Sequence, residues 1–119
     1  MLLHDQVTIT LTEKVDTLSG ATPRVHTIDN VPCEITPLDS TKNVADQVLT
    51  TRYRFFSTFD LVTAIDQQLA EWPGNVGVTV TMNYKGKTLK TAAGIEVHRV
   101  LARFHHVEAI LNDFYSVGA

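Results

Sequence analysis

The sequence predicts a mainly β fold, a small antiparallel β-barrel or sandwich with long loops and one short helix near residues 60–72. Three observations support this fold class. Threonine and valine are frequent, and both favour strands. Apolar and polar residues alternate in several short segments. Helical spacing of apolar residues occurs in one segment only. With 119 residues, 44% of them hydrophobic, residues 1–119 are expected to form a single domain.

The first third of the chain predicts two strands separated by a loop. Residues 6–12 alternate strictly between apolar and threonine side chains, as a half-buried strand does. Residues 13–23 contain glycine, proline and serine, and predict a long exposed loop. Residues 24–38 are extended again. Pro32 and Pro37 cannot donate ladder hydrogen bonds, so this strand should be irregular or lie at an edge.

The middle of the chain predicts a second loop, a strand and the helix. Residues 39–46 are polar and aperiodic, which is typical of a loop. Residues 47–57 form the next strand. From 60 to 72 the apolar residues follow helical spacing. Asp60 can cap the start of this helix, and the Pro-Gly pair after Trp72 ends it.

The last part of the chain predicts four strands. Residues 76–84 show the clearest alternation, and Lys85–Gly86 should form a tight turn in which Gly86 takes a positive φ. The remaining expected elements are strands at 87–92, 95–100 and 103–111 and a short C-terminal tail at 112–119.

Bulk properties exclude several classes of function. The net charge of −3 argues against a protein that wraps nucleic acid, which would carry a basic excess. No apolar run approaches the ~20 residues that span a bilayer, and the N-terminus does not read as a signal peptide. We therefore expect no membrane association, and a protein used in the cytoplasm or in a particle assembled there.

The single cysteine, Cys33, has no partner for an intramolecular disulfide or a CxxC motif. Alternation places it with Val31 and Ile35, so we interpret it as a small buried apolar residue. A catalytic thiol would need a base. His26 is the nearest histidine in the sequence, and nothing orients it toward Cys33.

A metal centre is the sharpest enzymatic alternative, with His98, His105, His106 and Glu108 as ligands. Strand geometry disfavours it, since His105 and His106 should point to opposite faces. The two could share a metal only with a bulge, and His98 would have to return from a separate strand. No nucleophile elbow or phosphate-binding loop is present either. We predict no enzyme, no catalytic residue, no metal and no cofactor.

A single-stranded nucleic-acid-binding barrel is another alternative, because aromatic residues stand among arginines in residues 52–56. The order Arg52-Tyr53-Arg54-Phe55-Phe56 places Tyr53 and Phe55 on the face opposite the arginines. This pattern favours a barrel strand with a buried aromatic face and a solvated arginine row.

Several segments resemble the head-to-tail stopper proteins, also called head-closure or head-completion proteins, of long-tailed bacteriophages. The similar segments are VTITLTE, VPCEITPLDS followed by VLTTRYRFF, and YKGKTL followed by HRVLARFHHVEAIL, of which HHVEA is the most specific. Together they span most of the chain. The helical segment at 60–72 departs from the shorter polar connection expected in that family.

The resemblance implies a structural protein of the virion neck, assembled in the host cytoplasm. Such proteins form a ring below the portal and its adaptor, close the channel after DNA packaging and provide the docking surface for the tail. A ring of six copies is preferred, with twelve as the alternative. The implied partners are the portal adaptor protein, the tail terminator or tail tube protein, and packaged double-stranded DNA in transient contact.

Two polar loops are the candidate sites within this interpretation. The channel-gating candidate is the 39–46 loop, and the adaptor or tail docking candidate is the 13–23 loop. A tail terminator or another connector ring protein of the same particle is the nearest alternative function. The candidate gating residues are Asp39, Ser40, Thr41, Lys42, Asn43 and Asp46, and the candidate docking residues are Asp16, Thr17, Ser19 and Arg24.

Overall fold

The computed structural model describes residues 3–15, 18, 20–43, 48–92 and 94–116. It is mainly β, with 61% strand, and it confirms the predicted fold class of an antiparallel barrel with one short helix. The elements are β1 (Asp5–Glu13), β2 (Val25–Asn43), β3 (Val48–Ser57), α1 (Leu61–Glu71), β4 (Val78–Tyr84), β5 (Lys87–Thr91), β6 (Glu96–Val100) and β7 (Arg103–Ser116).

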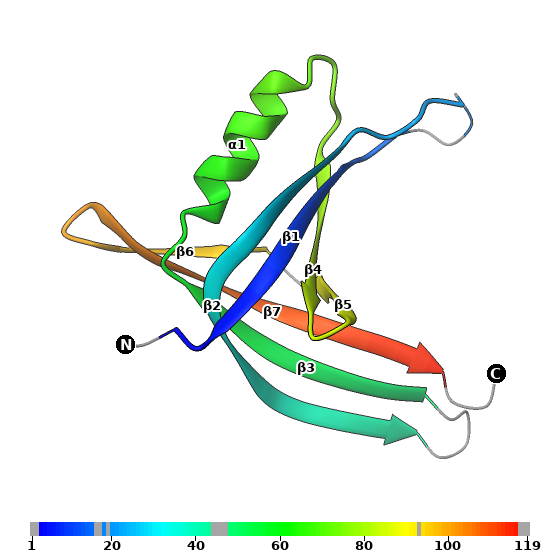
Figure 1. Cartoon of the computed structure of the whole chain (residues 1–119), viewed down its shortest axis with the longest axis vertical. Helices are drawn as coiled ribbons and strands as arrows, with labels where there is room; N and C mark the ends of the chain where they lie inside the picture. Colours follow the sequence, from blue (N-terminus) through cyan, green and yellow to red (C-terminus); the bar gives the residue numbers. More distant parts are fainter. Residues whose placement is uncertain (1–2, 16–17, 19, 44–47, 93, 117–119) are drawn as a thin grey trace.

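Six of the strands close into a barrel in the order β3-β2-β1-β4-β5-β7, and the pairing of β3 with β7 completes the circle (Figure 1). All of the pairs are antiparallel. β6 is outside this circle and pairs with the first half of β7. Closure satisfies strand edges that an open sheet would leave free, whereas β6 pairs on one side only among the described residues, with β7.

The barrel interior is filled by the apolar residues that alternate along the strands. Val7, Ile9 and Leu11 of β1 point inward and are almost fully buried, as the strict alternation of this segment predicts. Cys33 lies among them and is completely buried. The fully buried side chains that complete this core include Phe55, Met82, Leu89, Val107 and Leu111.

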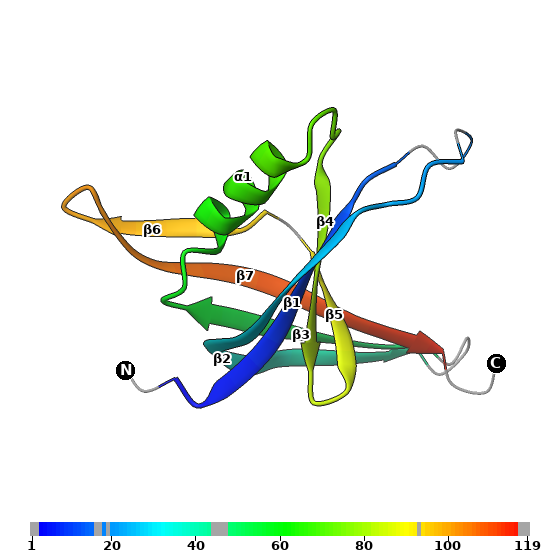
Figure 2. The same ribbon diagram turned by 45° about the horizontal axis from the view of Figure 1, so that its top comes forward.

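The helix lies across one end of the barrel, beside β2 (Figures 1 and 2). Asp60 caps it as predicted, because its carboxylate accepts the backbone N–H of Thr63 at 3.1 Å. Leu61 and Trp72, at the two ends of the helix, are buried in the barrel core. The helix therefore closes this end of the core. In the part of the chain that the structure describes, no helix has the length and apolar character needed to cross a bilayer.

The β4–β5 turn also follows the sequence prediction. Lys85 and Gly86 have φ values of 50° and 80°, and Tyr84 pairs with Lys87. Two consecutive positive φ values are the signature of the two-residue hairpin turn that matches the twist of its strands.

The predicted loop at 39–46 is wrong for residues 39–43, which continue β2. They pair with residues 48–52 of β3, from Asp39↔Arg52 to Asn43↔Val48. The predicted tail is wrong for residues 112–116, which continue β7 and pair with 48–52. We call these paired segments the β2–β3 arm: residues 39–43, 48–52 and 113–116. It extends past β5, whose last pairs with β7 are at Asn112 and Leu111 (Figure 1).

The sequence prediction was wrong here because it relied on alternation, which is present only where one face of a strand is buried. Strand pairing itself requires only backbone partners, and polar residues provide these as well. Beyond β5 the arm is held by ladder hydrogen bonds between β2, β3 and β7. The arm is therefore a three-stranded extension of the barrel wall rather than a loop.

Replacing Leu89 by alanine should destabilise the protein by about 2–5 kcal/mol, because this side chain is fully buried and its loss leaves a cavity. The neighbouring exposed residue provides the control, since Lys90→Ala should change stability by no more than ~0.5 kcal/mol. Urea unfolding followed by circular dichroism measures both. Equal effects of the two substitutions would contradict the inward orientation of Leu89.

Candidate functional site

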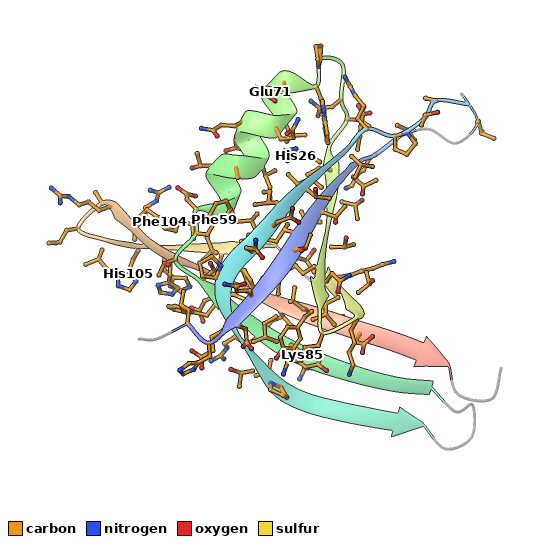
Figure 3. The ribbon with its side chains drawn as sticks, in the orientation of Figure 1. His26, Phe59, Glu71, Lys85, Phe104 and His105 are labelled. Carbon is orange, nitrogen blue, oxygen red and sulfur yellow. The ribbon has the colours of Figure 1, made fainter. Side chains whose placement is uncertain are left out.

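The candidate site lies on the outer face of the wall formed by β2, β3, β7 and β6. Its central groups come from the β6–β7 hairpin, which turns through Leu101 and Ala102 with φ values of 50° and 64°. Val100 pairs with Arg103 on either side of this turn. Figure 3 labels His105 and Phe104, which lie on this hairpin.

A β-bulge in β7 sets the register of the hairpin. Arg99 pairs with Phe104, and continued regular pairing would place His98 opposite His105. The register instead shifts by one residue, and His98 pairs with His106. His105 is the extra residue. Such a bulge interrupts strict alternation and redirects side chains.

The bulge brings His98, His106 and Glu108 together. Nε2 of His98 lies 2.8 Å from Oε2 of Glu108, and Nε2 of His106 lies 3.2 Å from the same oxygen. The two imidazole rings stack with centroids 4.4 Å apart and an interplanar angle of 9°. One nitrogen of each histidine and one carboxylate oxygen lie within 4.8 Å of one another. We call these three residues the His-His-Glu cluster.

Residues of β3 support the cluster from the other side of β7. The ring of Phe56 stacks on His106 with centroids 4.4 Å apart. Nε of Arg54 lies 3.9 Å from Oε1 of Glu108, the carboxylate oxygen that the histidines do not contact. Phe56 and Glu108 are directly paired in the β3–β7 ladder, so barrel closure sets this arrangement.

His105 is exposed and is not one of the three clustered groups, but it contacts His106. Their Nδ1 atoms lie 2.6 Å apart, so one ring donates a hydrogen bond and the other accepts it. The expectation that His105 and His106 face opposite sides is therefore wrong. The bulge at His105 is the reason, because it removes the alternation on which that expectation rested.

Two shallow hollows flank the cluster and share Arg54 and Glu108 in their walls. One lies toward β6 and the other toward β2. Their remaining lining residues are Gly94, Glu96, Ala109 and Ile110 for the first, and Glu34, Thr36 and Phe56 for the second. Glu108 lines both hollows, so its carboxylate can be approached from either side, whereas Nε2 of His98 is buried.

The structure describes only part of the two segments predicted as loops. Of the gating candidates, Asp39, Ser40, Thr41, Lys42 and Asn43 lie in β2, and Asp46 lies outside the described residues. The docking candidates Asp16, Thr17 and Ser19 also lie outside the described residues.

The remaining docking candidate, Arg24, forms an ion pair within the chain. Its guanidinium donates to both carboxylate oxygens of Glu13 and also to the backbone carbonyl of Pro73 at 3.1 Å. It lies 5.7 Å from the ring centre of Trp72. These contacts join the loop end of the β1–β2 hairpin to the segment that follows the helix. Arg24 thus has a structural role that its sequence position does not reveal.

The interpretation of Cys33 as a core residue is confirmed. Its side chain is fully buried, and burial raises the pKa of the thiol to about 12. A thiol with this pKa is almost entirely protonated at neutral pH, and the thiolate is the nucleophilic form.

The arginine-aromatic strand also has the two faces predicted for it. Tyr53 and Phe55 are buried, whereas Arg52 and Arg54 are exposed. Lys87 of β5 reaches this strand, with its Nζ 3.4 Å from the hydroxyl of Tyr53. Lys85 belongs to the β4–β5 turn, well away from the β6–β7 hairpin (Figure 3).

Sequence reasoning missed Phe56 and Arg54 as neighbours of the histidines. Neither is near them in sequence, and only the pairing of β3 with β7 brings them together. Comparisons with protein-family models, curated proteins and solved structures found no match to this chain.

Replacing Glu13 by glutamine should lower the melting temperature by a few degrees at pH 7. The hydrogen bonds from Arg24 hold the pKa of Glu13 below its usual range. A lowered pKa in the folded state stabilises the fold above the ordinary carboxylate pKa of ~4.3, and this stabilisation disappears as the pH falls through the folded-state value.

The difference in melting temperature between wild type and Glu13→Gln should therefore narrow as the pH falls below ~4.3. Calorimetric scans across pH measure it, with Glu71→Gln, an exposed helix position, as the control that should show little difference at any pH. A constant difference across this range would contradict the ion pair.

Proposed function

We propose that this chain is a structural protein of the neck of a long-tailed phage particle, of the head-closure type. It forms a ring below the portal adaptor, closes the channel after packaging and provides the surface for tail attachment. Two extensions project from the small closed barrel, the β2–β3 arm and the β6–β7 hairpin. These extensions, together with the resemblance of the strand sequences to that family, support the proposal.

The β2–β3 arm is the proposed channel element. It is built on three strands, so it can hold its position against the pressure of packaged DNA better than a loop of the same length. It contains the polar residues 39–43 proposed for gating. The net charge of −3 disfavours tight binding of phosphates, so DNA could pass once the channel opens.

The tip of the β6–β7 hairpin is the proposed contact with a neighbouring copy. Leu101 and Val100 are 93% and 55% exposed at this tip. Leu101 and Ala102 both have positive φ, which is unfavourable for residues with a Cβ. Exposed apolar side chains on a projecting hairpin fit a docking contact in an assembly. A ring of six copies is preferred, with twelve as the alternative.

The shape of the subunit is consistent with a ring layer, with principal extents of 45 × 45 × 22 Å. The proposed partners are the portal adaptor on one side and the tail terminator or tail tube protein on the other. A tail terminator of the same particle would share these features but would bind purified tails rather than filled heads. For a single-strand-binding barrel, the ring of Phe56 is poorly placed because it already stacks on His106.

Shortening the β2–β3 arm tests the gating role. Residues 41–50 are replaced by an Asn-Gly turn that joins the paired residues Ser40 and Thr51, so that the barrel is retained. We expect particles that package DNA and then lose it, measured as the fraction of DNA-filled heads by electron microscopy. Lys90→Ala particles are the control. Normal DNA retention with the short arm would contradict the gating role.

A charge at the hairpin tip tests the ring contact. Leu101→Asp should reduce incorporation of the tagged chain into necks at least about tenfold, because burying an apolar side chain of this size contributes ~1.5–3 kcal/mol. Val76→Asp is the matched control, since Val76 is 76% exposed in a different part of the chain. Localisation of the tagged wild-type chain away from the neck would overturn the proposed function as a whole.

A further inference from the structure

We propose that His98, His106 and Glu108 form a binding site for a divalent transition-metal cation, with Zn²⁺ as the best fit. Two imidazoles and one carboxylate are a ligand set that suits zinc and leaves a further coordination position open. The inference is independent of the proposed function, because it depends only on the outer face of the β6–β7 hairpin.

The distances between the ligand atoms fit a small cation. Zinc–ligand bonds of ~2.0–2.2 Å in a tetrahedral site place ligand atoms roughly 3.4 Å apart. Oε2 of Glu108 lies 2.8 Å from Nε2 of His98 and 3.2 Å from Nε2 of His106. All three ligand atoms are within 4.8 Å, so small side-chain rotations bring them to bonding distance.

The hydrogen bonding of His98 is incomplete without a ligand. Its Nε2 atom is buried and has no hydrogen-bond partner. The nearby Glu108 oxygen, at 2.8 Å, does not lie in hydrogen-bond geometry with it. A buried polar atom without a partner is costly. A cation placed between the nitrogen and the carboxylate would satisfy both groups.

The positions of two carboxylates, Glu96 and Glu108, also favour a bound cation beside Nε2 of His98. Glu96 is directly opposite Glu108 in the β6–β7 ladder, and like charges in that position repel. Oε2 of Glu96 lies 3.4 Å from Nε2 of His98, close enough to provide a fourth ligand. Arg54 lies near Oε1 of Glu108 and leaves Oε2 for the cation.

Neighbouring groups orient the ligands. When Nδ1–H of His106 donates to Nδ1 of His105, the lone pair of His106 Nε2 is directed toward Glu108. The stacked ring of Phe56 restricts rotation of His106. Among the described residues, β6 pairs with β7. A cation held by His98 of β6 and by two residues of β7 would therefore fasten β6 to the barrel.

Isothermal titration of the chelator-treated full chain with Zn²⁺ alone tests the site. We expect one Zn²⁺ per chain. With Co²⁺ as the spectroscopic probe, the visible ligand-field bands of a site with nitrogen and oxygen ligands should appear. His98→Asn and the near-isosteric Glu108→Gln should each weaken Zn²⁺ binding by at least about 100-fold, more than the ~10–100-fold typical of changes beyond the ligands themselves.

The matched control is His26→Asn, an exposed histidine of β2 outside the cluster, which should bind Zn²⁺ like wild type. His105→Phe should weaken binding by about 10–100-fold while the Co²⁺ bands persist, because His105 orients a ligand without being one. Circular dichroism verifies that each variant folds. Failure of the folded wild-type chain to bind Zn²⁺ at 1:1, or wild-type binding by folded Glu108→Gln, would overturn the proposal. Neither result would bear on DNA retention, which tests the neck function.

Discussion

Closure of the barrel depends on the pairing of β3 with β7, which extends from Val48↔Ser116 to Ser57↔Val107. Without this ladder the seven strands would form an open sheet with β3 at one edge. The ladder turns Phe55 and Val107 toward a shared interior and, by alternation, turns Phe56 and Glu108 outward. The same pairing continues past β5 and supports the β2–β3 arm. The core, the arm and the outer face of the cluster are therefore consequences of one set of backbone hydrogen bonds.

The bulge at His105 adds a second constraint on the outer face. In a regular hairpin, the turn at Leu101 and Ala102 would set His98 opposite His105. One extra residue in β7 moves His98 opposite His106 instead, and the two rings stack beside Glu108. A single inserted residue thus decides which side chains gather at this face. Bulges that redirect side chains are common next to functional sites, and this one directs three ligand-type groups to one point.

Sequence patterns predicted those parts of the fold that local forces control. Inward alternation in β1, the Asp60 cap and the Lys85–Gly86 turn are each confirmed, because each depends on residues within a few positions of one another. Residues 39–43 and 112–116 were predicted as loop and tail. They are strands because segments far away in the chain supply their hydrogen-bond partners. The polar composition of a segment does not indicate which distant segment pairs with it.

The features of the candidate site also separate into those set by local sequence and those set by tertiary structure. The sequence by itself determined that His106 and Glu108 share a face, that Cys33 is buried and that the arginines of β3 face outward, since all of these follow from the two-residue period of a strand. Only the tertiary structure decided that His98 meets His106 and that Arg54 and Phe56 lie beside Glu108. The physical reason is that strand register and barrel closure depend on backbone pairing between distant segments, which local sequence patterns do not specify.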